Sequence, residues 1–432
     1  MRIYIFISSY IIFFGHKKMV DKSYWSRNMD RLTLLFFFFF KFAGLATFSL
    51  NNRANLNKKN SENTMFFISS KLGILYNLFG SCLIIALSFY SIPITMYADY
   101  VHKTIVTITI EIFLIILGCF VMTSTLLFYC IFESVIIRIG NYLINIENVL
   151  RHLQQPLNRK HIFNVLFFIC LFMLILLIIL LITEIKNFNP NPLVLMASII
   201  PLIFVGLLFI QYFFVLNLIY AIFVKLNCII QSFCRTRYDD INFKILNQTR
   251  CVFMSYSKIQ LFIQIRDIYD HLCDISREVS DFYSFSILTA LSFIFLVILY
   301  NFYYLFLHFV NDKLNFLLIT NAIIWIMLPL SLLALLTSKV TNVINEIEKT
   351  GCIIHVLLNC TIDRETKIEL EQFSLQLLHQ KVKFTANGYF TLDNTLFQSM
   401  INTVTTYMVI LFQFQMEISN ENDKFCNCTQ CR

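Results

Sequence analysis

The sequence predicts an all-α integral membrane protein with seven transmembrane helices, a cytoplasmic N-terminus and an extracellular C-terminus. Two observations predict this fold class. Hydrophobic residues make up 58% of the 432 residues and charged residues only 14%, whereas soluble domains have about 45–50% apolar and about 25% charged residues. In addition, Lys and Arg are concentrated in alternate loops between the apolar stretches. The composition excludes a soluble domain, a disordered chain and a coiled coil, and the net charge of +8 indicates orientation in a membrane rather than a nucleic-acid partner.

Seven stretches meet the length requirement of a membrane-spanning helix. Such a helix needs about 20 mostly apolar residues, because only a helix satisfies its backbone hydrogen bonds inside hydrocarbon. The predicted spans are residues 72–97, 105–128, 163–185, 193–220, 282–309, 316–336 and 394–416, the last being the most polar. Two earlier apolar runs, residues 3–14 and 32–40, are too short to cross, so interfacial or packed segments are expected there. A cleaved signal peptide is the alternative interpretation of the first run. A further alternative is that translation starts at Met19 or Met29.

The distribution of basic residues predicts the orientation. The segment before the first span and the loops after the second, fourth and sixth spans hold 29 of the 34 Lys and Arg residues. The opposite side holds only Lys103, Lys186, Lys313, Lys424 and Arg432. Loops rich in Lys and Arg stay in the cytoplasm. Long loops count less in this rule, but at every predicted span the more basic flank lies on the same side of the membrane.

The spans and the orientation together divide the chain into five parts. These are a cytoplasmic N-terminal segment (1–71), six transmembrane helices with cytosolic helical extensions (72–337), a cytoplasmic helical segment (338–391), a seventh transmembrane helix (392–416) and an extracellular tail (417–432).

The inner loops carry helical patterns of their own. Ahead of the fifth span, apolar residues alternate spacings of four and three, which predicts one helix that continues into the membrane. These residues are Leu261, Ile265, Ile268, Leu272, Ile275, Val279 and Phe282. After the sixth span, Asp363 is a candidate N-cap for a helix through about residue 380, and Gly388 is expected to break that helix. Amphipathic cytosolic helices need apolar partners, so we expect a compact intracellular helical bundle.

The last span carries a polar stripe. On a helical wheel, seven residues fall within an arc of about 120°; they are Asn394, Gln398, Asn402, Thr405, Thr406, Val409 and Gln413. The stripe has two interpretations: hydrogen bonding to other helices of the same subunit, or the lining of a pore. In a pore, Val409 would form a dewetting ring and Gln413 an amide ring, with Asp393 and Glu417 at the mouths, whereas Tyr407 points away.

The same helix carries a family resemblance. Residues 406–414 read Thr-Tyr-Met-Val-Ile-Leu-Phe-Gln-Phe, which fits the pattern of Thr-Tyr, five hydrophobic residues and Gln-Phe. This pattern resembles the signature of insect gustatory receptors. Residues 41–45 and the helix from His271 into the fifth span also resemble that family, so the similarity covers most of the chain from Lys41.

The resemblance implies a function. It implies a ligand-gated, non-selective cation channel in the plasma membrane of chemosensory neurons, opened by a small-molecule tastant and built as a homotetramer or a heteromer with related subunits. The implied pore-lining residues are Gln398, Asn402, Thr405, Thr406, Val409 and Gln413. The sugar-sensing branch looks to have Glu directly after Thr-Tyr, and Met408 holds that place here. A sugar is therefore not the expected ligand.

The resemblance also implies a ligand pocket in the outer half of the membrane domain. Candidate residues near the outer helix ends are Glu111, Tyr300, Tyr304, His308, Asn321 and Trp325. Glu111 is the strongest, because a carboxylate at that depth is costly unless it is paired or wetted. An aromatic belt at the membrane surface is the alternative role for the Tyr and Trp residues, and a structural pairing is the alternative for Glu111.

No pattern in the sequence indicates an enzyme, a cofactor or a metal site. A catalytic cluster, a Gly-rich phosphate loop and a nucleophile elbow are all missing. Cys426, Cys428 and Cys431 lack a fourth ligand and a common zinc spacing, and the 13 Cys are expected to be free thiols.

Two other function classes compete with the channel. A G-protein-coupled receptor would have an external N-terminus, an Asp-Arg-Tyr-like end to the third helix and Asn-Pro-x-x-Tyr in the seventh. A secondary transporter or non-conducting subunit would favour repeated halves or paired broken helices. The sequence has none of these motifs or repeats.

Overall fold

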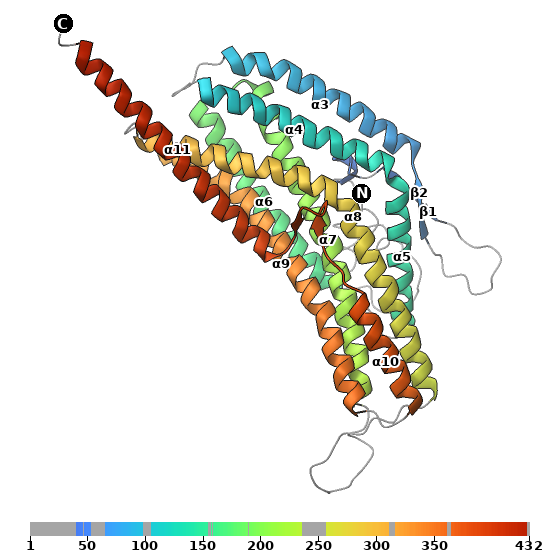
Figure 1. Cartoon of the computed structure of the whole chain (residues 1–432). Helices are drawn as coiled ribbons and strands as arrows, with labels where there is room; N and C mark the ends of the chain where they lie inside the picture. Colours follow the sequence, from blue (N-terminus) through green and yellow to red (C-terminus); the bar gives the residue numbers. More distant parts are fainter. Residues whose placement is uncertain are drawn as a thin grey trace.

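The computed structural model is a bundle of long helices, drawn in Figure 1. It describes residues 40–45, 47–52, 65–97, 105–153, 157, 159–188, 190–235, 256–310, 316–360 and 364–429. In these ranges the elements are, in chain order, β1 (Phe48–Asn52), β2 (Met65–Ser69), α3 (Lys71–Tyr97), α4 (Ile105–Ile131), α5 (Glu133–His152), α6 (Arg159–Phe188), α7 (Pro192–Arg235), α8 (Tyr256–Val310), α9 (Phe316–Cys360), α10 (Arg364–His379), β3 (Thr385–Ala386), β4 (Phe390–Thr391) and α11 (Asn394–Thr429).

Every predicted span lies inside one of these helices. Within the described residues, six stretches are long and apolar enough to cross a membrane: Lys71–Tyr97, Val106–Ile131, His161–Phe188, Pro192–Phe233, Ile259–His308 and Phe316–Asn359. The seventh predicted span is the first part of α11, whose polar stripe makes it less apolar than the other six. The all-α membrane fold with seven helices is confirmed, apart from two short hairpins.

Three of the membrane helices continue far beyond a bilayer. Helices α7, α8 and α9 contain 44, 55 and 45 residues. At about 1.5 Å per residue, α7 and α9 are roughly twice as long as the hydrocarbon core of about 30 Å, and α8 is nearly three times as long. Their extensions pack together with α10 at one end of the molecule (Figure 1).

The repeat predicted ahead of the fifth span forms the centre of this bundle. Ile265, Leu272 and Val279 of α8 are fully buried, as is Phe373 of α10. The guanidinium Nη1 of Arg266 lies 2.6 Å from Glu369 Oε2 and ties α8 to α10. The predicted continuous helix through the fifth span and the compact helical bundle are both present; the side of the membrane on which the bundle lies stays a prediction.

The structure corrects the role expected for Gly388. Helix α10 already ends at His379, and Gly388 lies later, in the turn of the β3–β4 hairpin, where Asn387 and Gly388 have φ values of 52° and 77°. A left-handed backbone suits Gly and Asn, which explains the turn. The proposed cap Asp363 and the apolar run 3–14 lie outside the described residues, and of the run 32–40 only Phe40 is described; it is fully buried.

The two hairpins and helix α5 were not predicted. Strands β1 and β2 pair antiparallel, with Phe48 opposite Ser69, and helix α5 packs against β2 and α8. The Ser69 hydroxyl donates a 2.9 Å hydrogen bond to the Glu133 carboxylate at the start of α5. The hairpin is thereby attached to the point where α4 gives way to α5.

Candidate ligand cavity and pore helix

A cavity of about 190 Å³ lies among α4, α6, α7, α8 and α9, with Thr95 of α3 at its edge. Its lining residues come from the helix ends next to the connections 98–104, 189–191 and 311–315. These ends lie away from the bundle that contains α10 (Figure 1). The lining is mostly apolar with a few polar groups, as in small-molecule sites generally.

One wall of the cavity is a hydrogen-bonded chain between α6 and α9. The Glu184 oxygen Oε2 accepts hydrogen bonds from Asn321 Nδ2 at 2.7 Å and from Trp325 Nε1 at 3.2 Å. The Asn321 oxygen in turn accepts a 3.0 Å bond from the Thr183 hydroxyl. Because the Thr183 hydroxyl and the Glu184 carboxylate occupy opposite ends of the amide, its orientation is fixed.

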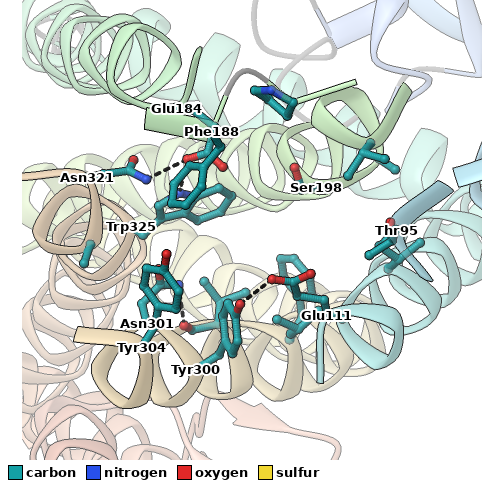
Figure 2. Close-up of a pocket in the computed structure, with 18 residues that line it drawn as sticks. Thr95, Glu111, Glu184, Phe188, Ser198, Tyr300, Asn301, Tyr304, Asn321 and Trp325 are labelled. Carbon is teal, nitrogen blue, oxygen red and sulfur yellow. Dashed lines mark hydrogen bonds between the residues drawn. The ribbon is translucent and has the colours of Figure 1, made fainter. Parts of the chain in front are cut away.

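The opposite wall carries the second carboxylate. Tyr300 of α8 donates a 2.5 Å hydrogen bond to Glu111 Oε1 of α4. Figure 2 shows this pair across the cavity from Glu184 and Trp325. Tyr304 lies one helical turn beyond Tyr300, with its ring centroid 6.1 Å from that of Phe188. Aromatic rings therefore lie beside both carboxylates.

The structure brings together five of the six residues expected in the pocket. Glu111, Tyr300, Tyr304, Asn321 and Trp325 all line the cavity.

His308 does not line the cavity. Its ring lies behind Tyr304, with centroids 4.6 Å apart, and is 2% exposed.

Sequence reasoning missed Glu184, the central acceptor of the first wall. The argument that singled out Glu111, a carboxylate within an apolar stretch, applies equally to Glu184 near the end of the third predicted span. A search of the predicted spans for carboxylates would therefore have found Glu184.

The polar stripe of α11 lies away from the rest of the subunit. Among the side chains of this helix that the structure describes, Met400, Val404 and Met408 are buried, spaced one turn apart, and they pack on the side of α8 and α9. The predicted pore-lining residues Gln398, Asn402, Thr405, Thr406, Val409 and Gln413 are all exposed. Tyr407 lies at the edge of the packed face, where its ring meets that of Phe295 at 6.1 Å between centroids.

Asp393 begins α11 in the manner of an N-cap. Its carboxylate accepts hydrogen bonds from the Thr395 backbone N–H at 2.9 Å and from the Thr395 hydroxyl. Partial burial raises the pKa of Asp393, but these bonds outweigh burial, and the net pKa lies below its ordinary value. A negative charge is therefore present at this end of α11 at neutral pH.

These features define the class of protein. Six helices of a membrane protein line a cavity of small-molecule size, and the polar face of the seventh, α11, is exposed. The chain belongs to the 7tm Chemosensory receptor family, whose pattern matches residues 33–418. This is a family of chemosensory receptors, not of enzymes.

Individual relatives agree with this assignment. The chain is 31% identical to gustatory receptor 28b of Drosophila melanogaster over 173 residues, and this aligned segment covers 38% of this chain and 36% of the relative. It is 35% identical over 100 residues to gustatory and pheromone receptor 32a of the same species, 23% of this chain and 21% of that one. The matched segments thus span little more than a third of these relatives at most.

Solved structures show the same fold. The insect olfactory receptor OR5 from Machilis hrabei matches with a TM-score of 0.58 and 14% identity, covering 90% of this chain and 99% of that one. The structure of that receptor in complex with eugenol matches with a TM-score of 0.53 and 15% identity, covering 90% and 98%.

Proposed function

We propose that this chemoreceptor is a gustatory receptor that works as a ligand-gated, non-selective cation channel. A small tastant binds in the cavity, and four copies of α11, from identical or related subunits, surround the pore. The N-terminus lies in the cytoplasm and the receptor resides in the plasma membrane of chemosensory neurons.

The uncovered polar face of α11 carries this proposal. Gln398, Asn402 and Gln413 expose amide groups on a helix whose opposite face packs against α8 and α9. Hydrocarbon offers an amide no hydrogen-bond partner, so a polar face at membrane depth requires either water or another protein surface. A ring of α11 helices around a water-filled axis supplies both.

Helix α8 connects the cavity to the pore helix. Tyr300 and Tyr304 of α8 line the cavity, and on the same helix Phe295 and Phe306 contact α11. The Phe306 and Phe412 rings stack at 3.8 Å between centroids. A ligand that favours one position of α8 therefore changes the packing of α11 directly, which is the differential interaction that gating requires.

Cysteine scanning of residues 394–413 tests the pore assignment. Receptors are expressed in cells without a coupled G protein, and current is recorded during treatment with a water-soluble thiol reagent. Block should recur every three to four residues along the polar face, at positions such as Gln398, Asn402 and Val409. The parent receptor with only its native Cys is the control. Uniform block, or block centred on Tyr407, contradicts the assignment.

A further inference from the structure

We propose that the cavity recognises a small organic cation, an ammonium compound whose charge lies against Glu184 and the aromatic rings beside it. This inference rests on the proposed function in one respect, namely that the cavity is the ligand site. It adds the chemical class of the ligand.

The charges of the lining point to a cation. Among the described residues that line the cavity, two are acidic, Glu111 and Glu184, and none is Lys, Arg or His. The hydrogen-bond donors on Glu184 are the Asn321 amide and the Trp325 indole, both neutral. They orient the carboxyl group without supplying a positive charge. A carboxylate taken out of water is costly without an opposite charge, and a bound ammonium group supplies that charge.

The aromatic residues of the lining suit the same ligand. Phe188, Tyr300, Tyr304 and Trp325 all line the cavity, and Figure 2 shows them around the space between the two carboxylates. The faces of such rings attract ammonium groups, and aromatic cages recognise even quaternary ammonium ions. Rings next to carboxylates favour an organic cation over an inorganic one, because the rings also bury apolar surface.

The size of the cavity limits the ligand. A volume of about 190 Å³ is below the range of about 300–1,000 Å³ typical of sites for drug-sized molecules. The cavity therefore suits a compact amine with a single ring. Neutral isosteres lack the charge, and carboxylate analogues are repelled by both glutamates.

The test compares three probes of nearly equal shape: 2-phenylethylamine, which is a cation at neutral pH, 2-phenylethanol and phenylacetate. Binding is measured as ligand-dependent thermal stabilisation of the full-length receptor in nanodiscs, which needs no channel opening. The amine should stabilise the wild type saturably, at a concentration at least about tenfold lower than the alcohol, and phenylacetate should have no effect. Equal stabilisation by amine and alcohol, or none by the amine, would overturn the proposal without any variant.

Glu184→Gln tests the assigned residue. Glutamine keeps an oxygen acceptor for Asn321 and Trp325 but removes the charge, so the amine should bind at least about tenfold more weakly. Glu348→Gln, the same change at an exposed position of α9, should leave binding unchanged. Unaltered amine binding in Glu184→Gln would remove Glu184 from the site and with it the proposal.

Current recordings on the same proteins separate this inference from the channel proposal. Amine binding that Glu184→Gln weakens, in a receptor that conducts no current, supports the cation site and contradicts the channel. Current evoked by a neutral odorant such as eugenol and abolished by the cavity-filling change Ala197→Trp, with no binding of the amine, supports the channel and overturns the cation site.

Discussion

The side chain of Asn321 shows how a single residue sets the geometry of the cavity. Its oxygen accepts a hydrogen bond from Thr183 and its nitrogen donates one to Glu184. Rotation of the amide by 180° would bring its oxygen against the Glu184 carboxylate and break both bonds. The Glu184 carboxylate, which only accepts, therefore sets the orientation of the amide, and the Thr183 hydroxyl stabilises that orientation by donating to the amide oxygen.

Thr183→Val should weaken ligand binding without touching the ligand. The change keeps the shape of the side chain but removes the donor to Asn321, which costs about 1 kcal/mol and should raise the half-maximal agonist concentration about fivefold. Thr123→Val is the matched control, because within the described residues the Thr123 hydroxyl bonds backbone carbonyls of α4 and no side chain. Dose–response curves of current measure both. If Thr123→Val raised the half-maximal agonist concentration as much as Thr183→Val, the effect would come from helix packing rather than from the bond to Asn321.

Val409 is expected to act as the apolar gate of the pore helix. Its side chain is 49% exposed on the polar face of α11, between Thr405 and Gln413. A ring of apolar side chains in a narrow pore expels water and stops conduction. Val409→Ser should therefore wet the closed pore and produce current without agonist.

Ile410→Ser is the control for the Val409 variant. Ile410 is 39% exposed but lies outside the polar arc. Its replacement should leave the resting current at the wild-type level, when surface expression is matched. Resting currents that rise equally in both variants would show that loss of apolar surface, rather than pore wetting, opens the channel.

The cavity illustrates what could be predicted at the residue scale. Glu111, Tyr300 and Asn321 were identifiable because each places a polar group in an apolar span. The pairing of these residues was not predictable, since Glu184 and Asn321, for example, are 137 positions apart and no local pattern joins them. Only the packing of α6 against α9 does so.

At the scale of elements, the length of apolar stretches predicted the membrane helices, because hydrocarbon leaves the backbone no other structure. Helix α5 was missed although Ile136, Ile139, Leu143, Ile146 and Leu150 follow helical spacing and are all buried. Its exposed residues, such as Ser134, Arg138 and Asn145, are polar, so the segment resembles a loop between two spans. The hairpins were missed because strands of five and two residues carry little periodicity.

The contact of α4 with α7 depends on Gly118. A Cβ atom built there would lie 2.8 Å from Cγ of Pro201 and 3.3 Å from the ring of Phe293, which lines the cavity. Gly118→Ala should therefore push α4 away from α7 and lower the free energy of unfolding by about 1–3 kcal/mol, the usual cost of overpacking.

Gly80→Ala is the control for this contact. A Cβ there has only one neighbour, Cδ1 of Leu126 at 4.0 Å, so the change should be neutral or slightly stabilising because alanine favours helix. Thermal unfolding of the two purified variants measures the difference. Equal stability would show that α4 and α7 can separate at Gly118 without cost.

At the scale of the whole molecule, the bundle that contains α10 lies at one end of the long helices α8 and α9 (Figure 1), and the residues of these helices that line the cavity come from their other end. The bundle end holds basic residues such as Arg266, Arg277 and Lys349, whereas the connections at the cavity end carry few. If basic residues set the orientation, the bundle faces the cytoplasm and the cavity faces outward, within reach of external tastants. Ligand access and charge bias thus favour the same orientation.

Epitope tags test that orientation. In unpermeabilised cells, an antibody should detect a C-terminal tag and should miss an N-terminal one, which becomes visible only after permeabilisation. Asn247 and Asn359 lie in formal glycosylation sequences on the predicted cytoplasmic side, so a glycosidase should not change the mobility of the protein through either site. Replacing both by Gln provides the matched control. Surface detection of the N-terminal tag, or sugar on Asn247, would reverse the orientation, place the cavity toward the cytoplasm and require tastants to cross the membrane before binding.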